Sequence, residues 1–411
     1  MKRVVIVAGK ASYRTADFLA AASLLRVEAY IVGDGELPAG NPGLVVDLGD
    51  VSRSAAAIAA RYPNVDAVVA MDDQGVLAAA AAGELLGLRH NSLDAVAATR
   101  DKAVLRGRLA GSNVMQPRHR TAPPGMVPRA AAAIGYPVVV KPTGLAASRG
   151  VIRVDGPDTA VATEDRVRAI LKSAGVPQSQ QLLVEEFVPG DEIVIEALLG
   201  ADGPEVLAII DKPDAMDGPY FEETLYVTPS RHNPDHLGDA IALVAKAVTA
   251  LGLETGPIHA EVRISPQGVC YLIEIAARSI GGLCGRSLSF GLLGESLEVM
   301  VLRSALGLST LDASPGRPAA GVLMLPIPAT GTLTEIAGIE AARAIDGIDD
   351  ISITIPIGRR VETLPEGDRY LGFVFAGGSD PESVENALRR AGNELAITID
   401  GEEVRPPTSL T

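Results

Sequence analysis

The first hundred residues alternate β-branched runs with alanine-rich stretches, and this alternation limits the possible folds more than any other feature of the chain. The strand-like runs are RVVIVAG, VEAYIVG, GLVVDLG and VDAVVAM, and the helix-like stretches are TADFLAAASLL, SAAAIAARY and GVLAAAAAGELLGL. Strands that alternate with helices of this length form a parallel sheet covered by helices. We therefore expect a Rossmann-like α/β unit here. The turn VAGKASYR lacks the G-x-G-x-x-G pattern, so no dinucleotide site is expected in it.

Composition narrows the class of ligand. The net charge of -15 argues against a surface for nucleic acid or for an anionic membrane, so a small molecule is the favoured ligand. The cysteines, Cys270 and Cys284, have no disulfide or zinc spacing, which fits a reducing compartment. The first apolar run is too short for a signal peptide or a membrane span. We expect a cytoplasmic protein with no nucleic-acid partner and no membrane association.

The chain has 411 residues, so the part that follows the first hundred is long enough for further domains. A helix is expected to begin near Thr99, and the prolines of VMQPRHRTAPPGMVP indicate a connection. A hairpin with a Gly/Ser/Ala tip follows in YPVVVKPTGLAASRGVIRV, and the later strands predict a mostly antiparallel α+β unit. After a linker at STLDASPGRP, strands alternate with a helix that Asp380 is placed to cap. We expect domains at 1–97, 98–314 with a lid at about 128–200, and 315–411.

Two glutamates interrupt a pair of apolar runs in residues 258–282, IHAEVRISPQGVCYLIEIAARSIGG. Strand alternation places Glu261 on the polar face of the first run. If Ser265 to Gly268 form the turn, Glu261 lies opposite Leu272, and Glu274 becomes its diagonal neighbour at roughly 7 to 8 Å. The sequence therefore predicts two carboxylates that converge on one face of a hairpin.

Two interpretations of this acidic pair remain open. Like charges at that range repel unless a cation lies between them, and magnesium takes hard oxygen ligands together with substrate phosphates. Alternatively, each glutamate pairs with an arginine such as Arg263 or Arg278. The hairpin by itself favours neither.

Three motifs occur in a fixed order: VVVKPTGLAASRGV, LLVEEFVPGDEIVIE and HAEVRI followed by YLIEIAARSIGG. Together they resemble the ATP-grasp superfamily, most closely the bacterial L-amino-acid (dipeptide) ligases and more distantly biotin carboxylase. The resemblance implies an ATP-grasp fold of the α/β and α+β classes, with a Rossmann-like N-terminal domain and a C-terminal cap. It also implies a carboxylate-amine ligase that forms an amide, in this case a dipeptide bond, through an acyl phosphate with release of ADP.

Two rivals are weighed against this activity. A carboxylase of the biotin carboxylase kind would act through carboxyphosphate at the same nucleotide site. The second rival is a nucleotide-binding regulatory or assembly protein without catalysis. The presence of Glu261, Glu274, Lys141 and Arg278 argues against it.

The resemblance assigns residues to ATP. The loop from Gly144 to Gly150 can offer backbone N–H groups to phosphates, and a strand rather than a helix follows it, so it is not a Walker loop. Lys141 ends an apolar strand and needs an anionic partner, which a nucleotide phosphate supplies. Lys102 matches the family's second phosphate-contacting lysine, although by itself it reads as a solvated surface charge. The expected nucleotide-binding residues are Lys102, Lys141, Ser148, Arg149, Gly150, Glu185, Glu186, Phe187, Val188 and Glu192.

The resemblance also assigns the chemistry. Glu261 and Glu274 are the expected ligands of magnesium, or of manganese in its place, and Arg278 is expected to stabilise charge on a phosphoryl group. Glu223 matches a carboxylate that receives a substrate amine or acts as a base. The expected substrates are a small carboxylate and a small amine, both amino acids, and the family suggests a homodimer.

Overall fold

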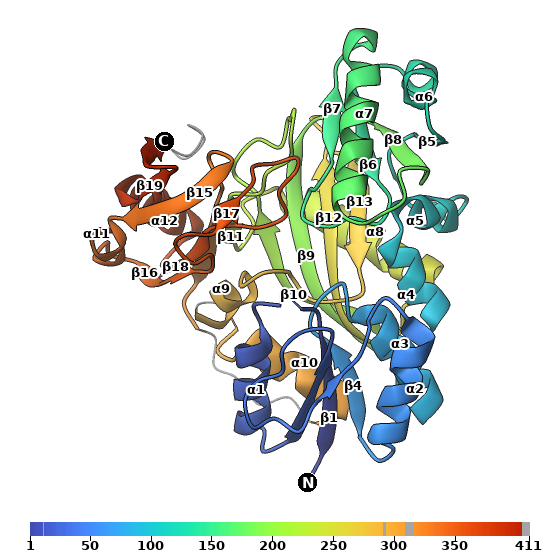
Figure 1. The fold of residues 1–411 in the computed structure, drawn as a ribbon, viewed down its shortest axis with the longest axis vertical. Coiled ribbons are helices and arrows are strands. Elements are labelled where there is room, and N and C mark those ends of the chain that lie inside the picture. The colour runs from blue at the N-terminus through green and yellow to red at the C-terminus, as the bar shows by residue number, and fades with distance from the viewer. Residues whose placement is uncertain (11, 291–292, 309–315, 405–411) are drawn as a thin grey trace.

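The computed structural model of the protein describes residues 1–10, 12–290, 293–308 and 316–404. In Figure 1 the N-terminal sheet lies at the bottom, a small sheet lies at the top, and the C-terminal strands and helices lie on the left. A long central sheet joins these parts. No helix in the described part of the chain is long and apolar enough to cross a lipid bilayer.

The N-terminal sheet is parallel, as the alternation of runs predicts. Its strand order is β3-β2-β1-β4. The strands are β1 (Arg3–Ala8), β2 (Glu28–Gly33), β3 (Leu44–Val45) and β4 (Ala67–Ala70), and the helices are α1 (Thr15–Leu24), α2 (Val51–Arg61) and α3 (Val76–Leu86). β1 is central, and its side chains from Val4 to Ala8 are buried because helices cover both faces of the sheet.

Two short helices, α4 (Leu93–Arg100) and α5 (Lys102–Leu109), replace the single helix expected to begin near Thr99. Asp101 separates them, because its extended backbone ends α4 while its side chain accepts hydrogen bonds from two N–H groups at the start of α5. The prediction was wrong because an aspartate inside a helical pattern was not read as a cap.

The small sheet at the top of Figure 1 lies mostly within residues 128–200, where the sequence predicts a lid, and we keep the name lid for this sheet and its helices. Its strand order is β5-β8-β6-β7. Its elements are β5 (His119–Ala122), α6 (Val127–Ile134), β6 (Val138–Pro142), β7 (Ile152–Val154), α7 (Pro157–Ser173) and β8 (Leu182–Glu186). The hairpin of β6 and β7 is confirmed. The proline-rich stretch predicted to be a connection instead contains β5 and the start of α6. The sequence pattern did not predict α7, although Pro157 is typical of the first turn of a helix.

The central sheet is antiparallel throughout, in the order β13-β12-β9-β10-β11-β14-β18-β16. Its strands are β9 (Asp191–Gly200), β10 (Gly203–Asp211), β11 (Leu225–Thr228), β12 (Gly256–Ile264), β13 (Cys270–Ala276), β14 (Ala319–Leu325), β16 (Ile348–Ile353) and β18 (Gly372–Gly378). The associated helices are α8 (Pro234–Leu251), α9 (Gly285–Phe290) and α10 (Leu297–Leu306). This sheet runs on past residue 315, where we predict a domain boundary, because β14 pairs with β11.

The C-terminal part also contains a four-stranded sheet of its own, in the order β17-β15-β19-β20. Its elements are β15 (Gly331–Ala337), α11 (Ile339–Arg343), β17 (Arg360–Val361), α12 (Pro381–Glu394), β19 (Ala396–Ile399) and β20 (Glu402–Val404). The predicted cap of α12 is confirmed: the side chain of Asp380 accepts a hydrogen bond from the Ser383 N–H at 2.8 Å. Most of the predicted linker STLDASPGRP lies outside the described residues.

Candidate active site

A cavity of about 580 Å³ opens where the lid, the central sheet, the N-terminal loops and the C-terminal part meet. Its wall includes the predicted site residues Lys102, Lys141, Ser148, Arg149, Glu185, Glu186, Phe187, Val188, Glu192, Glu223, Glu261, Glu274 and Arg278. Gly150 is not part of the wall. Its N–H donates to the Pro365 carbonyl at 2.9 Å, and a Cβ at this position would lie 2.9 Å from the ring of Pro142.

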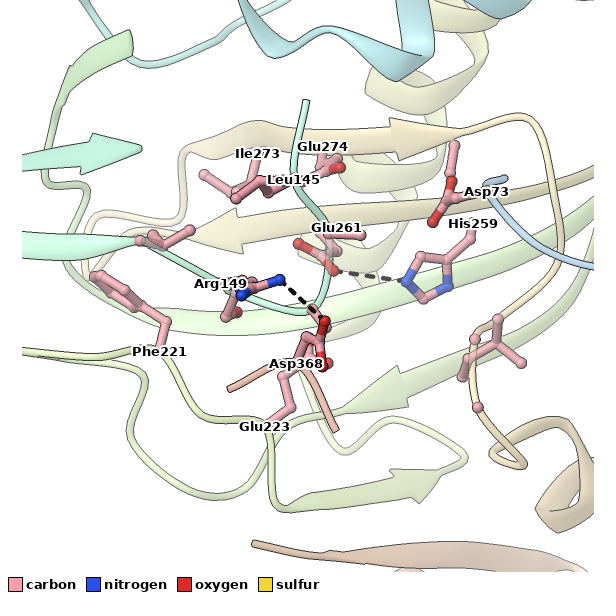
Figure 2. Close-up of a pocket in the computed structure, with 18 of the residues that line it drawn as sticks. Asp73, Leu145, Arg149, Phe221, Glu223, His259, Glu261, Ile273, Glu274 and Asp368 are labelled. Carbon is pink, nitrogen blue, oxygen red and sulfur yellow. Dashed lines mark hydrogen bonds and ion pairs between the residues drawn. The ribbon is translucent and has the colours of Figure 1, made fainter. Parts of the chain in front are cut away.

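The two hairpin glutamates face each other directly, in a register that differs from the predicted one. Ile264 pairs with Cys270, so the turn is one residue longer than predicted, and that register alone would set Glu261 opposite Ile273. A β-bulge at this point shifts the pairing by one residue and brings Glu274 opposite Glu261. The predicted diagonal geometry is therefore wrong, although the convergence of the two carboxylates is confirmed (Figure 2).

A buried arginine supports the bulge. Arg106 is 1% exposed; its Nη2 donates to the Ile273 carbonyl at 2.7 Å, and its Nε donates to Glu185 at 2.5 Å. The bulge leaves the Ile273 carbonyl without a partner in the β12–β13 pairing, and Arg106 supplies the hydrogen bond that this carbonyl would otherwise lack. Arg106 thus links the acidic hairpin to the lid strand β8.

Lysines rather than arginines flank the two carboxylates. Lys102 Nζ lies 3.2 Å from Glu274, and Lys212 Nζ lies 3.7 Å from Glu261. His259 Nε2 lies 3.6 Å from the same Glu261 oxygen. Burial on its own would raise the pKa of Glu261, but Lys212 and His259 hold that pKa well below its ordinary value. Glu261 is therefore ionised.

The alternative in which arginines neutralise the acidic pair is wrong. Arg263 Nε donates to Glu192 at 3.0 Å, and Arg278 Nη2 donates to Asp73 at 2.8 Å. Burial would lower the pKa of Arg278, but Asp73 raises it further above its ordinary value, so the guanidinium keeps its charge. The side chains of Glu261 and Glu274 remain 20% and 28% exposed, towards the cavity.

Lys212 is a central residue that the motifs did not reveal. It follows β10, it is 2% exposed, and its Nζ lies 2.6 Å from Glu192 and 2.5 Å from Glu223. Carboxylate oxygens of Glu192, Glu223 and Glu261 all lie within 4.8 Å of one another around it. Burial lowers the pKa of Lys212, but these three carboxylates together raise it well above its ordinary value.

Lys141 has a protein partner in place of the predicted phosphate. Its Nζ forms a buried ion pair with Glu185, which Arg106 also contacts at 2.5 Å. Burial would raise the pKa of Glu185, but Arg106 and Lys141 lower it to about 2. A carboxylate already balances Lys141, so its predicted contact with ATP would be made by a partly neutralised cation.

The glycine loop lies over the cavity. Lys102 Nζ donates to the Leu145 carbonyl at 2.9 Å, which ties the loop to α5. Arg149 forms an ion pair with Asp368 of the C-terminal part at 3.3 Å, and Figure 2 draws this pair among the residues that line the cavity. Ala147 and Ser148 adopt φ of 55° and 53°, so the loop takes a left-handed turn without glycine at either position.

The predicted adenine and ribose segment lies at one end of the cavity. Glu186 forms an ion pair with Arg118, and the Val188 carbonyl accepts a hydrogen bond from Arg263. The same Arg263 lies over the ring of Phe187, with its Cζ 5.1 Å from the ring centroid. Glu192 is 6% exposed between Lys212 and Arg263. The nucleotide contacts of these residues stay predictions.

An N-terminal arginine positions the loop after β13. Arg14 Nη1 donates to the Ser279 hydroxyl at 2.8 Å and to the Ile280 carbonyl at 3.1 Å, while its Nη2 pairs with Glu298 at 2.6 Å. Glu196 accepts the Ile280 N–H at 3.1 Å. No local sequence signal points to Arg14, because its nearest hydrogen-bond partner in the chain, the Met71 carbonyl, is 57 residues away and Ser279, Ile280 and Glu298 are more than 260 residues away.

The facing glutamates fit a magnesium ion. They offer carboxylate oxygens, which are the ligands that magnesium prefers, from neighbouring strands and towards a cavity. Glu261 also belongs to the carboxylate cluster around Lys212, but in that cluster Lys212 Nζ is in direct contact with Glu192 and Glu223, at 2.6 and 2.5 Å, whereas it lies 3.7 Å from Glu261. The pair formed by Glu261 and Glu274 is therefore the better metal candidate.

Two family models match parts of this chain. Residues 134–287 match the ATP-grasp domain, and residues 323–400 match the L-amino acid ligase C-terminal domain 2. The alanine–anticapsin ligase of Bacillus subtilis is 35% identical over 165 residues, which cover 36% of this chain and 34% of that ligase. The match to this curated relative thus spans about a third of its length.

Two solved structures share the fold. The L-amino acid ligase from Bacillus licheniformis has a TM-score of 0.80 at 23% identity and covers 97% of this chain and 99% of its own. The biotin carboxylase from Campylobacter jejuni has a TM-score of 0.68 at 14% identity and covers 98% and 92%. The expected mixed α/β ATP-grasp fold is confirmed, and the chain contains an ATP-grasp domain at residues 134–287 and an L-amino acid ligase C-terminal domain at residues 323–400.

Proposed function

We propose that the protein is an ATP- and magnesium-dependent ligase that joins two amino acids through an amide bond. The observation that carries this proposal is the pair Glu261 and Glu274, brought face to face by the bulge and flanked by Lys102 and Lys212. Acidic ligands for a metal beside cationic groups for phosphate are what phosphoryl transfer from ATP requires. Bound magnesium would neutralise phosphate charge at this pair.

The reaction needs charge neutralisation and positioning more than covalent help from the protein. A carboxylate oxygen of the first amino acid attacks the γ-phosphorus, and the bond to the bridging oxygen breaks, so that ADP leaves with that electron pair. The amine of the second amino acid then attacks the carbonyl carbon of the acyl phosphate. Phosphate leaves with the C–O bond pair, and the ammonium nitrogen loses a proton to give the amide.

Each charged group has a place in this scheme. Lys102 and the glycine loop hold phosphate oxygens, and Arg278, oriented by Asp73, stabilises charge on the transferred phosphoryl group. Glu223 binds the substrate amine, because its carboxylate borders the cavity and is 20% exposed. The C-terminal match to L-amino acid ligases supports amino acids over bicarbonate as the substrate.

Phosphate release tests the proposal. Amino acids are supplied singly and in pairs with ATP and magnesium, with bicarbonate as a separate arm, and ¹⁸O in the substrate carboxylate is traced into phosphate. Transfer of ¹⁸O supports an acyl phosphate. Turnover that depends on bicarbonate alone, or no transfer of ¹⁸O from any carboxylic acid, would refute the ligase proposal.

A matched pair of variants checks that the hairpin carries the activity. Glu274→Gln removes one charge of the metal pair and is expected to lower kcat/KM for ATP by roughly 100-fold or more. The control is Glu205→Gln, at an exposed position on β10 of the same central sheet. Equal activity of the two variants would contradict the assigned metal site.

A further inference from the structure

Aromatic side chains gather at this cavity although the chain contains few of them. The sequence has eight tyrosines, six phenylalanines and no tryptophan. Six of those that the structure describes line the cavity: Tyr13, Phe187, Phe221, Tyr226, Tyr370 and Phe373. Such a concentration is unusual for a chain that is only 3% aromatic, and aromatic walls are typical of sites that bury apolar ligand surface.

The six aromatics form two separate groups. Phe187 and Phe221 pack with Val139 and Met216, beside the predicted adenine segment. The others lie with a different core cluster, in which Tyr13 and Tyr370 pack partly exposed against the buried Phe373. The ring centroids of Tyr13 and Phe373 are 6.1 Å apart, and those of Tyr370 and Phe373 are 6.0 Å apart, both edge to face. We call Tyr13, Tyr226, Tyr370 and Phe373 the aromatic wall.

Three remote parts of the chain build the aromatic wall. Tyr13 comes from the loop after β1, Tyr226 from β11, and Tyr370 and Phe373 from the end of a C-terminal loop and from β18. The buried methionines Met71 and Met324 complete the lining between them. Gly282 allows close approach here, since a Cβ on it would lie 2.9 Å from the Phe373 ring.

The polar groups beside the wall suit the main-chain end of an amino acid. Lys212 Nζ lies 2.5 Å from Glu223 and 5.5 Å from the centroid of the Tyr226 ring, so the Glu223 carboxylate lies close to the wall and lines the same cavity. Two arginines line this end, and each has a carboxylate partner: Arg14 pairs with Glu298, and Arg369 lies 3.8 Å from Asp368. Burial raises the pKa of Tyr226 and Tyr370 well above the ordinary value, so both stay neutral.

We propose that the aromatic wall holds the side chain of the amino acid whose amine binds Glu223, and that it selects an apolar side chain over a polar one of equal size. This inference rests on the proposed ligase function. Binding an apolar side chain against neutral rings and thioethers is favourable, because apolar surface leaves water. A buried amide or charged group would find few hydrogen-bond partners there.

The test compares isosteric amino acids. Initial rates of phosphate release are measured with leucine and asparagine, and with methionine and methionine sulfoxide, as the single varied amino acid. We expect kcat/KM to favour the apolar member of each pair by roughly 30-fold. Equal values overturn this inference while leaving the ligase intact. Absence of turnover with any amino acid overturns the ligase proposal, and this inference with it.

Two variants locate the selectivity. Tyr13→Ala and Tyr370→Ala, both at partly exposed loop positions, are each expected to reduce the leucine-to-asparagine ratio about fivefold. The matched control is Tyr30→Ala, because Tyr30 stacks on Tyr62 in the N-terminal sheet with centroids 4.6 Å apart and does not line the cavity. An unchanged ratio in both wall variants, with melting temperatures like that of the control, would contradict the proposal.

Discussion

Two buried lysines share one sequence context. Lys141 follows VVV and Lys212 follows AIID, and a proline comes directly after each. Both are under 10% exposed, and both have carboxylate partners from other strands. A buried lysine at the end of an apolar strand needs an anionic partner, and both lysines are in this position. Lys212 could therefore have been found from the sequence by the reasoning used for Lys141.

Lys212→Met tests the carboxylate cluster. The change leaves Glu192, Glu223 and Glu261 without their shared cation, so we expect a loss of about 3–5 kcal/mol in the free energy of unfolding. Because the pKa of Lys212 is raised, its contribution is fully present below the unfolded-state pKa of lysine and is lost only as pH rises through the folded-state pKa. Urea unfolding should therefore show a constant deficit between roughly pH 6 and pH 9.

The control for this change is Lys246→Met, on the exposed face of α8. It should cost less than about 0.5 kcal/mol. A deficit of similar size in both variants would mean that the cluster around Lys212 contributes nothing specific.

The variant Glu185→Gln is expected to change how the free energy of unfolding depends on pH. The folded-state pKa of Glu185 is about 2, against an ordinary value of 4.5. The ionised carboxylate therefore stabilises the fold above pH 4.5, and this contribution is lost as pH falls towards 2. The free energy of unfolding should differ between the parent and the variant by roughly 3 kcal/mol at neutral pH, with the difference shrinking below about pH 4.5. A difference that is independent of pH would contradict the ionised triad of Arg106, Lys141 and Glu185.

At the scale of elements, two local irregularities place the chemistry. The bulge in the β12–β13 pairing turns Glu274 onto the face of Glu261, and the break at Asp101 starts α5 at Lys102. Period-two alternation predicts strands well, but it cannot show where one residue is left unpaired. Here Arg106, which is remote in sequence, satisfies the freed carbonyl of Ile273.

The variant Asp101→Ala tests whether the cap of α5 also positions Lys102 at the site. Asp101 accepts two N–H bonds of α5 and the Thr143 hydroxyl at 2.8 Å, so its loss is expected to cost about 1 kcal/mol. It should also raise KM for ATP about fivefold, because Lys102 is the first residue of the helix that Asp101 caps.

Asp50→Ala is the matched control for this change, since Asp50 caps α2 by the same kind of bond. It should lower the melting temperature similarly and leave KM for ATP unchanged. If both variants raise KM equally, the cap of α5 does not position Lys102.

At the scale of the whole molecule, one C-terminal turn touches the lid at three points. The Pro365 carbonyl accepts the Gly150 N–H, Asp368 pairs with Arg149, and both oxygens of Glu366 accept from Arg166 of α7 at 2.7 and 3.0 Å. In Figure 1 the C-terminal part and the lid approach each other across the central sheet. This turn therefore holds the glycine loop closed over the cavity.

Glu366→Gln weakens that contact. The Arg166 and Glu366 side chains are 43% and 38% exposed, so the pair should add less than about 1 kcal/mol to global stability. We expect KM for ATP to rise about threefold, with little change in melting temperature, and we expect Arg166→Met to add nothing to the effect of Glu366→Gln. The control is Glu340→Gln, which breaks a surface pair with Arg343 within α11. Additive effects of the two lid changes would show that Arg166 and Glu366 do not act as a pair.

Local patterns in the sequence were enough to predict the parallel N-terminal sheet, the antiparallel strands, the cap of helix α12 and the polar face that carries Glu261. These features follow from the periodicity of strands and helices and from the side chains that cap a helix. Tertiary contacts set the bulge that brings Glu274 opposite Glu261, the anions around Lys141 and Lys212, and the meeting of Tyr13 with Phe373. Those depend on contacts between residues far apart in the chain, which no local pattern records.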